Sequence, residues 1–108
     1  MSFTITGEDA ATIAGFLEVS VHLILYVREI YPPALFERRK KYGVPVRMSR
    51  HPQLNEYIRG VCENVREWLT QGKLDSTALV VTDAKGVPVE RFLFDFKVTG
   101  GGGGGGGG

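Results

Sequence analysis

Apolar residues recur at helical spacing through the first third of the chain and form two neighbouring rows. Residues three and four positions apart lie on the same side of a helix, so two such rows predict a helix that is buried over most of its circumference. We expect it to begin at Thr6 or Asp9, both of them N-capping residue types, and to run to Tyr31. Pro32 and Pro33 then end it, because proline lacks an amide hydrogen. The rows consist of Ile13, Leu17, Val21 and Ile24, and of Phe16, Val19, Leu23, Tyr26 and Ile30.

A short hairpin is predicted next. Its strands are expected at Leu35–Lys41 and Val44–Met48, on either side of a turn at Tyr42 and Gly43. Glycine can take the positive φ that such a turn needs. Pro45 should confine the second strand to an edge, because it cannot donate to a neighbouring strand.

A second helix is predicted to begin at Pro52, since proline is favoured at the first helical position, and to end at Gly72. Its apolar residues form a single stripe, so we expect it to cover its surroundings with one face. Tyr57 belongs to this stripe by spacing and is expected to face the core; the alternative is a rim position at which a partner peptide docks. The stripe consists of Leu54, Tyr57, Ile58, Val61, Val65, Trp68 and Leu69.

Two strands are predicted after the second helix. Thr77–Thr82 is an apolar run, typical of a strand buried on both faces, and Val89–Val98 alternates with three phenylalanines on one side. The order of elements indicates an α+β fold in which a central buried helix and a second amphipathic helix pack on an antiparallel sheet. This much apolar surface exceeds what so short a chain can cover, so some of it is expected to be exposed.

Composition limits the domain count and the class of protein. The chain has 108 residues, and the glycine run 100–108 is expected to be a disordered tail after one domain at residues 1–99. The net charge of +1 gives no global attraction to nucleic acid or to an anionic membrane. Charged residues interrupt the most apolar stretch, Phe16–Ile30, so we expect no membrane span.

Catalytic chemistry finds little support in the sequence. His22 and His51 lie in separate predicted elements, and Cys62 is the one cysteine, so neither a metal-ligand spacing nor a disulfide framework is present. We interpret His22 as a helix residue paired with Glu18 one turn earlier, and His51 as part of a helix start. No enzymatic activity, cofactor or metal is therefore expected.

A basic run in the predicted hairpin is a candidate for contact with phosphate groups. The alternative, which we favour, is a solvated hairpin whose charge protects it from edge-to-edge pairing, and direct DNA contact is then not expected. The candidate patch consists of Arg38, Arg39, Lys40 and Lys41.

Three segments, taken in order and with their gaps, resemble the HORMA-domain family. They are FLEVSVHLILYVREIYP (Phe16–Pro32), RKKYGVPVRMSRHPQLNEYI (Arg39–Ile58) and VPVERFLFDF (Val87–Phe96). The last resembles a strand shared across the family. The first two are similar to the branch that contains the accessory, mitotic-arrest-deficient-like subunit of DNA polymerase zeta.

The resemblance implies a non-catalytic adaptor that holds a partner peptide against a sheet edge, under a mobile C-terminal segment called the safety belt. In this branch the adaptor acts in translesion DNA synthesis and repair, and its partners are a peptide of the polymerase zeta catalytic subunit and the Y-family inserter polymerase. Tyr57 corresponds to a peptide-contacting position, and Tyr31 is a weaker candidate. The resemblance also implies a nuclear location, with the cytoplasm in addition. A spindle-checkpoint regulator of mitosis is the alternative function.

The matched segments end where the family continues with a third helix and the belt. The resemblance therefore implies the N-terminal part of a HORMA domain, truncated before these elements, with impaired peptide binding. Oligomerisation is left open.

Overall fold

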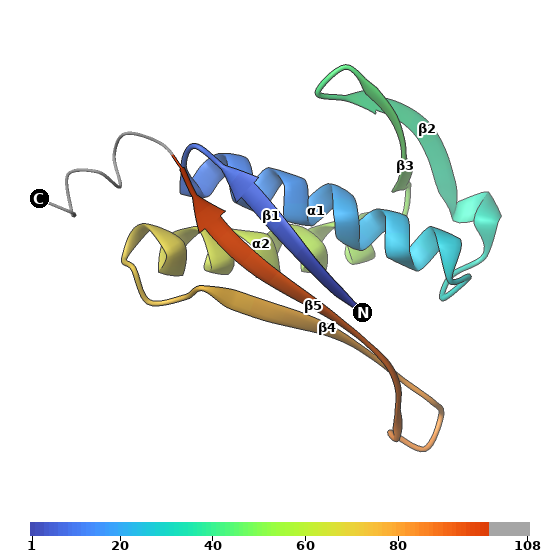
Figure 1. Cartoon of the computed structure of the whole chain (residues 1–108). Coiled ribbons are helices and arrows are strands. Elements are labelled where there is room, and N and C mark those ends of the chain that lie inside the picture. The colour runs from blue at the N-terminus through green and yellow to red at the C-terminus, as the bar shows by residue number, and fades with distance from the viewer. Residues whose placement is uncertain (100–108) are drawn as a thin grey trace, which may run out of the picture. The chain divides into compact units, whose positions relative to one another are not determined.

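A computed structural model describes residues 1–99, which contain two α-helices, one short 3-10 helix and five strands (Figure 1). The mixture confirms the predicted α+β class; the prediction for the glycine run 100–108 lies outside the described residues. The described residues divide into two compact units, one of residues 1–13 with residues 65–99 and one of Ala14–Asn64. The elements are β1 (Ser2–Gly7), α1 (Ala10–Val27), η1 (Pro33–Leu35), β2 (Phe36–Lys41), β3 (Val44–Ser49), α2 (Pro52–Thr70), β4 (Ser76–Thr82) and β5 (Pro88–Val98).

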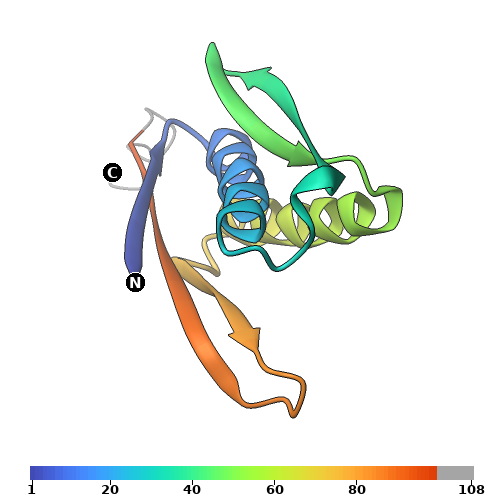
Figure 2. The same ribbon diagram turned by 90° about the vertical axis from the view of Figure 1, so that its right-hand side faces the viewer.

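The first unit contains a three-stranded sheet in the order β1-β5-β4, and Figures 1 and 2 both show β5 running between its neighbours. β4 pairs with β5 antiparallel, as predicted, whereas β1 pairs with β5 in parallel. The predicted antiparallel sheet is therefore wrong for one of its strands. The capping role expected for Thr6 is wrong as well, because Thr6 lies in β1 opposite Lys97.

The two faces of this sheet differ in burial. Phe92 and Phe94 are each 2% exposed, and the ring of Phe3 stacks at 6.5 and 5.6 Å from their centroids. Leu93 and Val80, on the opposite face, are exposed. The expectation of exposed apolar surface is therefore confirmed for this face, whereas Phe92 and Phe94 are covered. β4 alternates between half-buried and exposed positions, so the prediction of burial on both faces is wrong for this edge strand.

Helix α1 begins with the predicted cap and ends earlier than predicted. The Oδ1 atom of Asp9 accepts the N–H of Thr12 at 2.8 Å, and this hydrogen bond lowers the pKa of Asp9. At the other end Glu29 adopts a φ of 53°, and the N–H of Ile30 donates to the carbonyl of Leu25 at 3.0 Å. This is a Schellman cap, which ends the helix before Pro32 is reached.

Most side chains of α1 are buried or half-buried, as predicted, although Leu23 and Val27 are exposed. Length and composition alone would let this helix cross a membrane. The buried helix of a folded domain passes the same test. The buried imidazole of His22 and the half-buried Glu18 favour that second reading.

The second unit contains the predicted hairpin. β2 and β3 are antiparallel, and Tyr42 and Gly43 both have positive φ, at 53° and 75°, as a type I′ turn requires. The ring of Tyr42 lies 4.6 Å from that of Phe16, so the turn is held against α1. Pro45 lies opposite Lys40 in this two-stranded sheet, where each strand is an edge, as predicted.

Helix α2 begins at Pro52 and is followed by Gly72 with a φ of 70°, both as predicted. The predicted apolar stripe is divided, because Ile58 and Val65 are buried whereas Tyr57 is 70% exposed. The prediction that Tyr57 faces the core is therefore wrong: the predicted stripe is wider than the face that the helix buries. Val61 and Trp68 are exposed too.

Gly72 ends α2 in a second Schellman cap, because the N–H of Lys73 donates to the carbonyl of Trp68 at 2.9 Å. The two caps provide a matched test of backbone strain. A residue with a Cβ in the left-handed conformation is strained by about 1–2 kcal/mol. Glycine avoids this strain, but its greater conformational entropy in the unfolded chain offsets part of the gain. We expect Glu29→Gly to raise the free energy of unfolding by about 0.5–1 kcal/mol and Gly72→Ala to lower it by a similar amount. Urea denaturation of both variants checks this; destabilisation by Glu29→Gly would contradict it.

Candidate functional site

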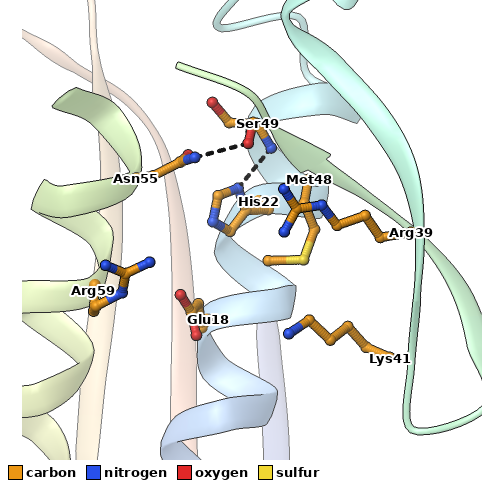
Figure 3. A pocket seen from close by; sticks show the side chains of 8 residues that line it. All are labelled: Glu18, His22, Arg39, Lys41, Met48, Ser49, Asn55 and Arg59. Carbon is orange, nitrogen blue, oxygen red and sulfur yellow. Dashed lines mark hydrogen bonds between the residues drawn. The ribbon is translucent and has the colours of Figure 1, made fainter. Parts of the chain in front are cut away.

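Polar residues of β2, β3, α1 and the start of α2 surround a cavity of about 230 Å³ in the unit Ala14–Asn64 (Figure 3). Each of these four elements contributes at least one side chain to the cavity wall. The lining residues are Glu18, His22, Arg39, Lys41, Met48, Ser49, Asn55 and Arg59.

His22 lies at the centre of this arrangement and is 2% exposed. Its Nδ1 atom accepts the backbone N–H of Ser49 at 3.1 Å (Figure 3). A neutral imidazole whose Nδ1 is an acceptor carries its hydrogen on Nε2. The predicted pairing with Glu18 is wrong: both side chains line the cavity, but the hydrogen bond of the ring goes to β3.

The pKa of His22 is lowered, first by burial and then by the positive charges of Arg39 and Lys41. Each of these disfavours the imidazolium form. The ring is therefore neutral at pH 7, which preserves the acceptor that Ser49 needs.

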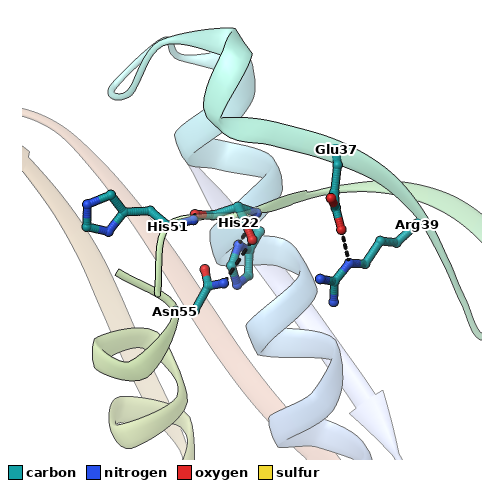
Figure 4. A network of polar contacts seen from close by, with 6 residues as sticks. His22, Glu37, Arg39, His51 and Asn55 are labelled. Carbon is teal, nitrogen blue, oxygen red and sulfur yellow. Dashed lines mark hydrogen bonds and ion pairs between the residues drawn. The ribbon is translucent and has the colours of Figure 1, made fainter. Parts of the chain in front are cut away.

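Ser49 connects β3 to the beginning of α2 through further hydrogen bonds, whose partners His51 and Asn55 are labelled in Figure 4. Its Oγ accepts the N–H of His51 at 2.9 Å, and its carbonyl accepts Nδ2 of Asn55 at 2.9 Å. His51 Nδ1 in turn accepts the N–H of Leu54 at 3.2 Å, so His51 caps α2, in agreement with its predicted place at a helix start. Asn55 Oδ1 is buried and has no hydrogen-bond partner in the part of the chain that the structure describes.

The basic run does not form one surface. Alternation along β2 places Arg39 and Lys41 on the side that lines the cavity. Arg39 also donates from Nε to Oε2 of Glu37 at 2.7 Å. Arg38 and Lys40 lie on the other side of the strand, where Arg38 borders a second cavity of about 300 Å³. The candidate patch is therefore divided between two faces, and the expectation that this run makes no direct DNA contact stays a prediction.

The candidate peptide-contacting residues lie outside both cavity linings. Tyr57 is exposed on α2, and Tyr31 is half-buried in the segment after α1. Their roles in peptide binding stay predictions. Among the described residues of the first unit, β1 and β4 are the two edge strands of the sheet. The outer edge of each carries backbone donors and acceptors with which an added strand can pair.

The sequence pattern identified only part of the cavity. Glu18 and His22 were singled out as a pair, and Arg39 and Lys41 for their charge, whereas Ser49, Asn55 and Arg59 were not identified as site residues. The contact between His22 and Ser49 joins positions 27 residues apart, which no periodicity reveals. Spacing alone could have indicated only that Asn55 and Arg59 share a face of α2, because they are four residues apart.

Within residues 1–99 no group of three or more His, Cys, Asp or Glu side chains is placed to hold a metal ion. Cys62 is buried, and burial, with Glu18 and Glu63 nearby, raises the pKa of its thiol to about 12. A thiol of this kind is a poor nucleophile at neutral pH.

A family model described as HORMA domain matches residues 10–105. The chain belongs to the HORMA-domain family. This confirms the resemblance found in the sequence, and the α+β architecture agrees with it.

Several proteins of this family are similar to the chain. The mitotic spindle assembly checkpoint protein MAD2B of Gallus gallus is 49% identical over 99 residues, which cover 85% of this chain and 47% of the relative. The DNA polymerase zeta processivity subunit of Arabidopsis thaliana is 36% identical over 93 residues, covering 86% and 43%. The chain thus spans about half the length of the curated relatives it matches.

A solved structure agrees with this HORMA fold. A chain in the crystal structure of a mitotic checkpoint complex superposes with a TM-score of 0.74 and 29% identity, over 80% of this chain and 45% of that one.

The lowered pKa of His22 predicts an acid-sensitive fold. Below the ordinary histidine pKa of 6.5 the unfolded chain takes up a proton at His22 that the folded ring resists. The free energy of unfolding therefore decreases as the pH is lowered. The fall is at most about 1.4 kcal/mol per pH unit. Denaturation between pH 8 and 5 measures it.

Two variants separate His22 from the other histidine. His22→Asn keeps an acceptor near the position of Nδ1 but cannot titrate, so its stability should depend less on pH. His51→Ser keeps a capping oxygen and should retain the wild-type dependence. An unchanged slope in His22→Asn would contradict the assignment.

The buried thiol predicts slow chemical modification. At pH 7.5 a disulfide reagent should label Cys62 far more slowly in the folded chain than in urea, because reaction needs both exposure and a thiolate. Absorbance of the released thiolate follows the reaction. Labelling of the folded chain at the rate of a free cysteine would show that the thiol is exposed.

Proposed function

We propose that this HORMA protein is a non-catalytic adaptor of translesion DNA synthesis, an accessory subunit of DNA polymerase zeta that binds peptides of its partners. The observation that carries this proposal is the 36% identity to the Arabidopsis polymerase zeta processivity subunit over 86% of the chain. The proposed partners are a peptide of the polymerase zeta catalytic subunit and the Y-family inserter polymerase. The proposed location is the nucleus.

The structure offers two features that support peptide binding. The outer edges of β1 and β4 carry backbone groups that an added strand can pair with. Tyr57 presents an apolar ring and a polar hydroxyl at 70% exposure, and tyrosine is enriched among residues that dominate binding energy at interfaces. We assign Tyr57 to the peptide contact, with Tyr31 as a secondary candidate.

A role in the spindle checkpoint is the second candidate. Relatives that carry the name mitotic spindle assembly checkpoint protein MAD2B reach 49% identity, and the matching solved chain comes from a mitotic checkpoint complex. Both candidate functions consist of binding partner proteins without catalysis. The identity of the bound partner therefore distinguishes the polymerase role from the checkpoint role.

Affinity purification from cells that express the protein with a tag at its own locus separates the candidates. The proposal predicts recovery of the polymerase zeta catalytic subunit, enriched after DNA damage that blocks replication. Recovery of mitotic regulators without the polymerase would favour the checkpoint role and contradict the proposal.

The assignment of Tyr57 predicts a loss of binding without a loss of stability. Tyr57→Ala should weaken capture of the polymerase zeta catalytic subunit about tenfold or more, as removal of an interface anchor does. Because the ring is exposed, the melting temperature should change little. Leu23→Ala truncates an exposed apolar side chain on α1 and is the matched control. Equal capture by both variants would remove Tyr57 from the binding surface.

A further inference from the structure

The cavity around His22 has the charge of an anion site. Its lining holds three cationic side chains, Arg39, Lys41 and Arg59, against the single carboxylate of Glu18. The cations come from two elements, β2 and α2, and their side chains lie around one space in Figure 3. Part of the charge of Arg39 is already balanced by Glu37. The remaining excess is positive.

A buried hydrogen-bond donor, the Nε2–H of His22, accompanies these cations in the cavity lining. The ring of His22 is 2% exposed and lines the cavity, while its Nδ1 accepts from Ser49. The Nε2–H is thereby the ring's remaining polar group, and none of the hydrogen bonds described for this unit engages it. A donor held in this way, beside cations, is suited to an oxyanion.

Asn55 contributes an acceptor with no donor. Its Nδ2 donates to the carbonyl of Ser49, which fixes the orientation of the amide. Its Oδ1 is buried and has no hydrogen-bond partner within residues 1–99, and Asn55 is one of the residues that line the same cavity. A buried acceptor normally finds a donor, so this amide oxygen is an unsatisfied polar group beside the cavity.

We propose that this cavity binds a phosphate group, delivered either as free phosphate or as the phosphorylated serine or threonine of a partner. The phosphate oxygens would accept from His22 Nε2 and from the cations of β2 and α2. A phosphorylated side chain carries about 1.5 to 2 negative charges at neutral pH and three acceptor oxygens, so it can accept from His22 Nε2 and from more than one cation at once.

The proposal extends beyond the proposed adaptor function and does not depend on it. None of the lining residues belongs to β1 or β4, and Tyr57 is not among them. Failure of polymerase capture would leave the phosphate site untouched, and the reverse also holds.

Nuclear magnetic resonance titration of the 108-residue chain tests the proposal. The ligands are inorganic phosphate, N-acetyl-phosphoserine methylamide and, as the carboxylate comparison, N-acetyl-aspartate methylamide. We expect saturable shifts of the His22 ring and the Asn55 side-chain amide with one or both phosphates, and weaker binding of aspartate. Bound phosphate should also raise the measured pKa of His22, because it offsets the charges of Arg39 and Lys41. Binding of inorganic phosphate alone identifies the free ion as the source, whereas binding of phosphoserine admits a modified partner.

The alternation of β2 supplies matched controls for charge removal. Arg39→Gln and Lys41→Gln, on the cavity side, should each weaken phosphate binding about fivefold or more, since each removes a charged hydrogen-bond donor at a partly solvated site. Arg38→Gln and Lys40→Gln remove the same charge from the opposite side of the strand and should change the dissociation constant less than about twofold. All four positions lie on an exposed hairpin, and amide spectra verify that the variants fold.

Three outcomes would overturn the proposal. Equal weakening by all four variants would show diffuse attraction to a basic hairpin. Aspartate binding as tight as phosphoserine binding would identify a carboxylate site instead. The absence of shifts at His22 and Asn55 in folded wild-type chain, at phosphate concentrations that perturb other residues, would place any binding elsewhere.

Discussion

The hydrogen bond from the Ser49 amide to His22 Nδ1 is the contact on which the second unit depends most. It is buried, and it joins α1 to the end of β3 across 27 positions of sequence. The same serine binds His51 and Asn55, so one residue sets where the hairpin ends and where α2 begins. A buried polar group left without its partner costs about 1–3 kcal/mol, which makes the neutral form of His22 part of the fold.

This constraint also determines what faces the cavity. With Nδ1 engaged, the ring presents Nε2–H to a space lined by residues from β2 and α2. The alternation of β2 then selects Arg39 and Lys41 for the cavity and leaves Arg38 and Lys40 outside it. A basic run that looks continuous in the sequence therefore divides into two surfaces with different surroundings.

Elements specified by local chemistry could be predicted from the sequence. The hairpin follows from a turn at Tyr42 and Gly43, and the start of α2 from His51 and Pro52. β1 was missed because a parallel strand is recognised through its partner β5, which lies about 90 positions further along the chain. Yet Phe3 and Ile5 do alternate with polar residues, which was an available if weak signal.

The site was less predictable than the fold. The HORMA resemblance named Tyr57 through its match to a family motif, whereas helical spacing placed the same residue in the core. Spacing shows which residues share a side of α2, but not how wide the buried part of that side is. The cavity depends on His22, Ser49 and Asn55 meeting from three elements, and this requires the tertiary structure.

The tautomer and hydrogen bonding of His22 at pH 7 are the most direct test of the contact between His22 and Ser49. Long-range nitrogen–proton spectra distinguish the two ring nitrogens, and hydrogen exchange reports on the Ser49 amide. The hydrogen bond from the Ser49 amide to His22 Nδ1 predicts a neutral ring with its proton on Nε2 and a Ser49 amide among the slowest to exchange in the hairpin. A proton on Nδ1, or a charged ring, together with rapid exchange at Ser49, would contradict it.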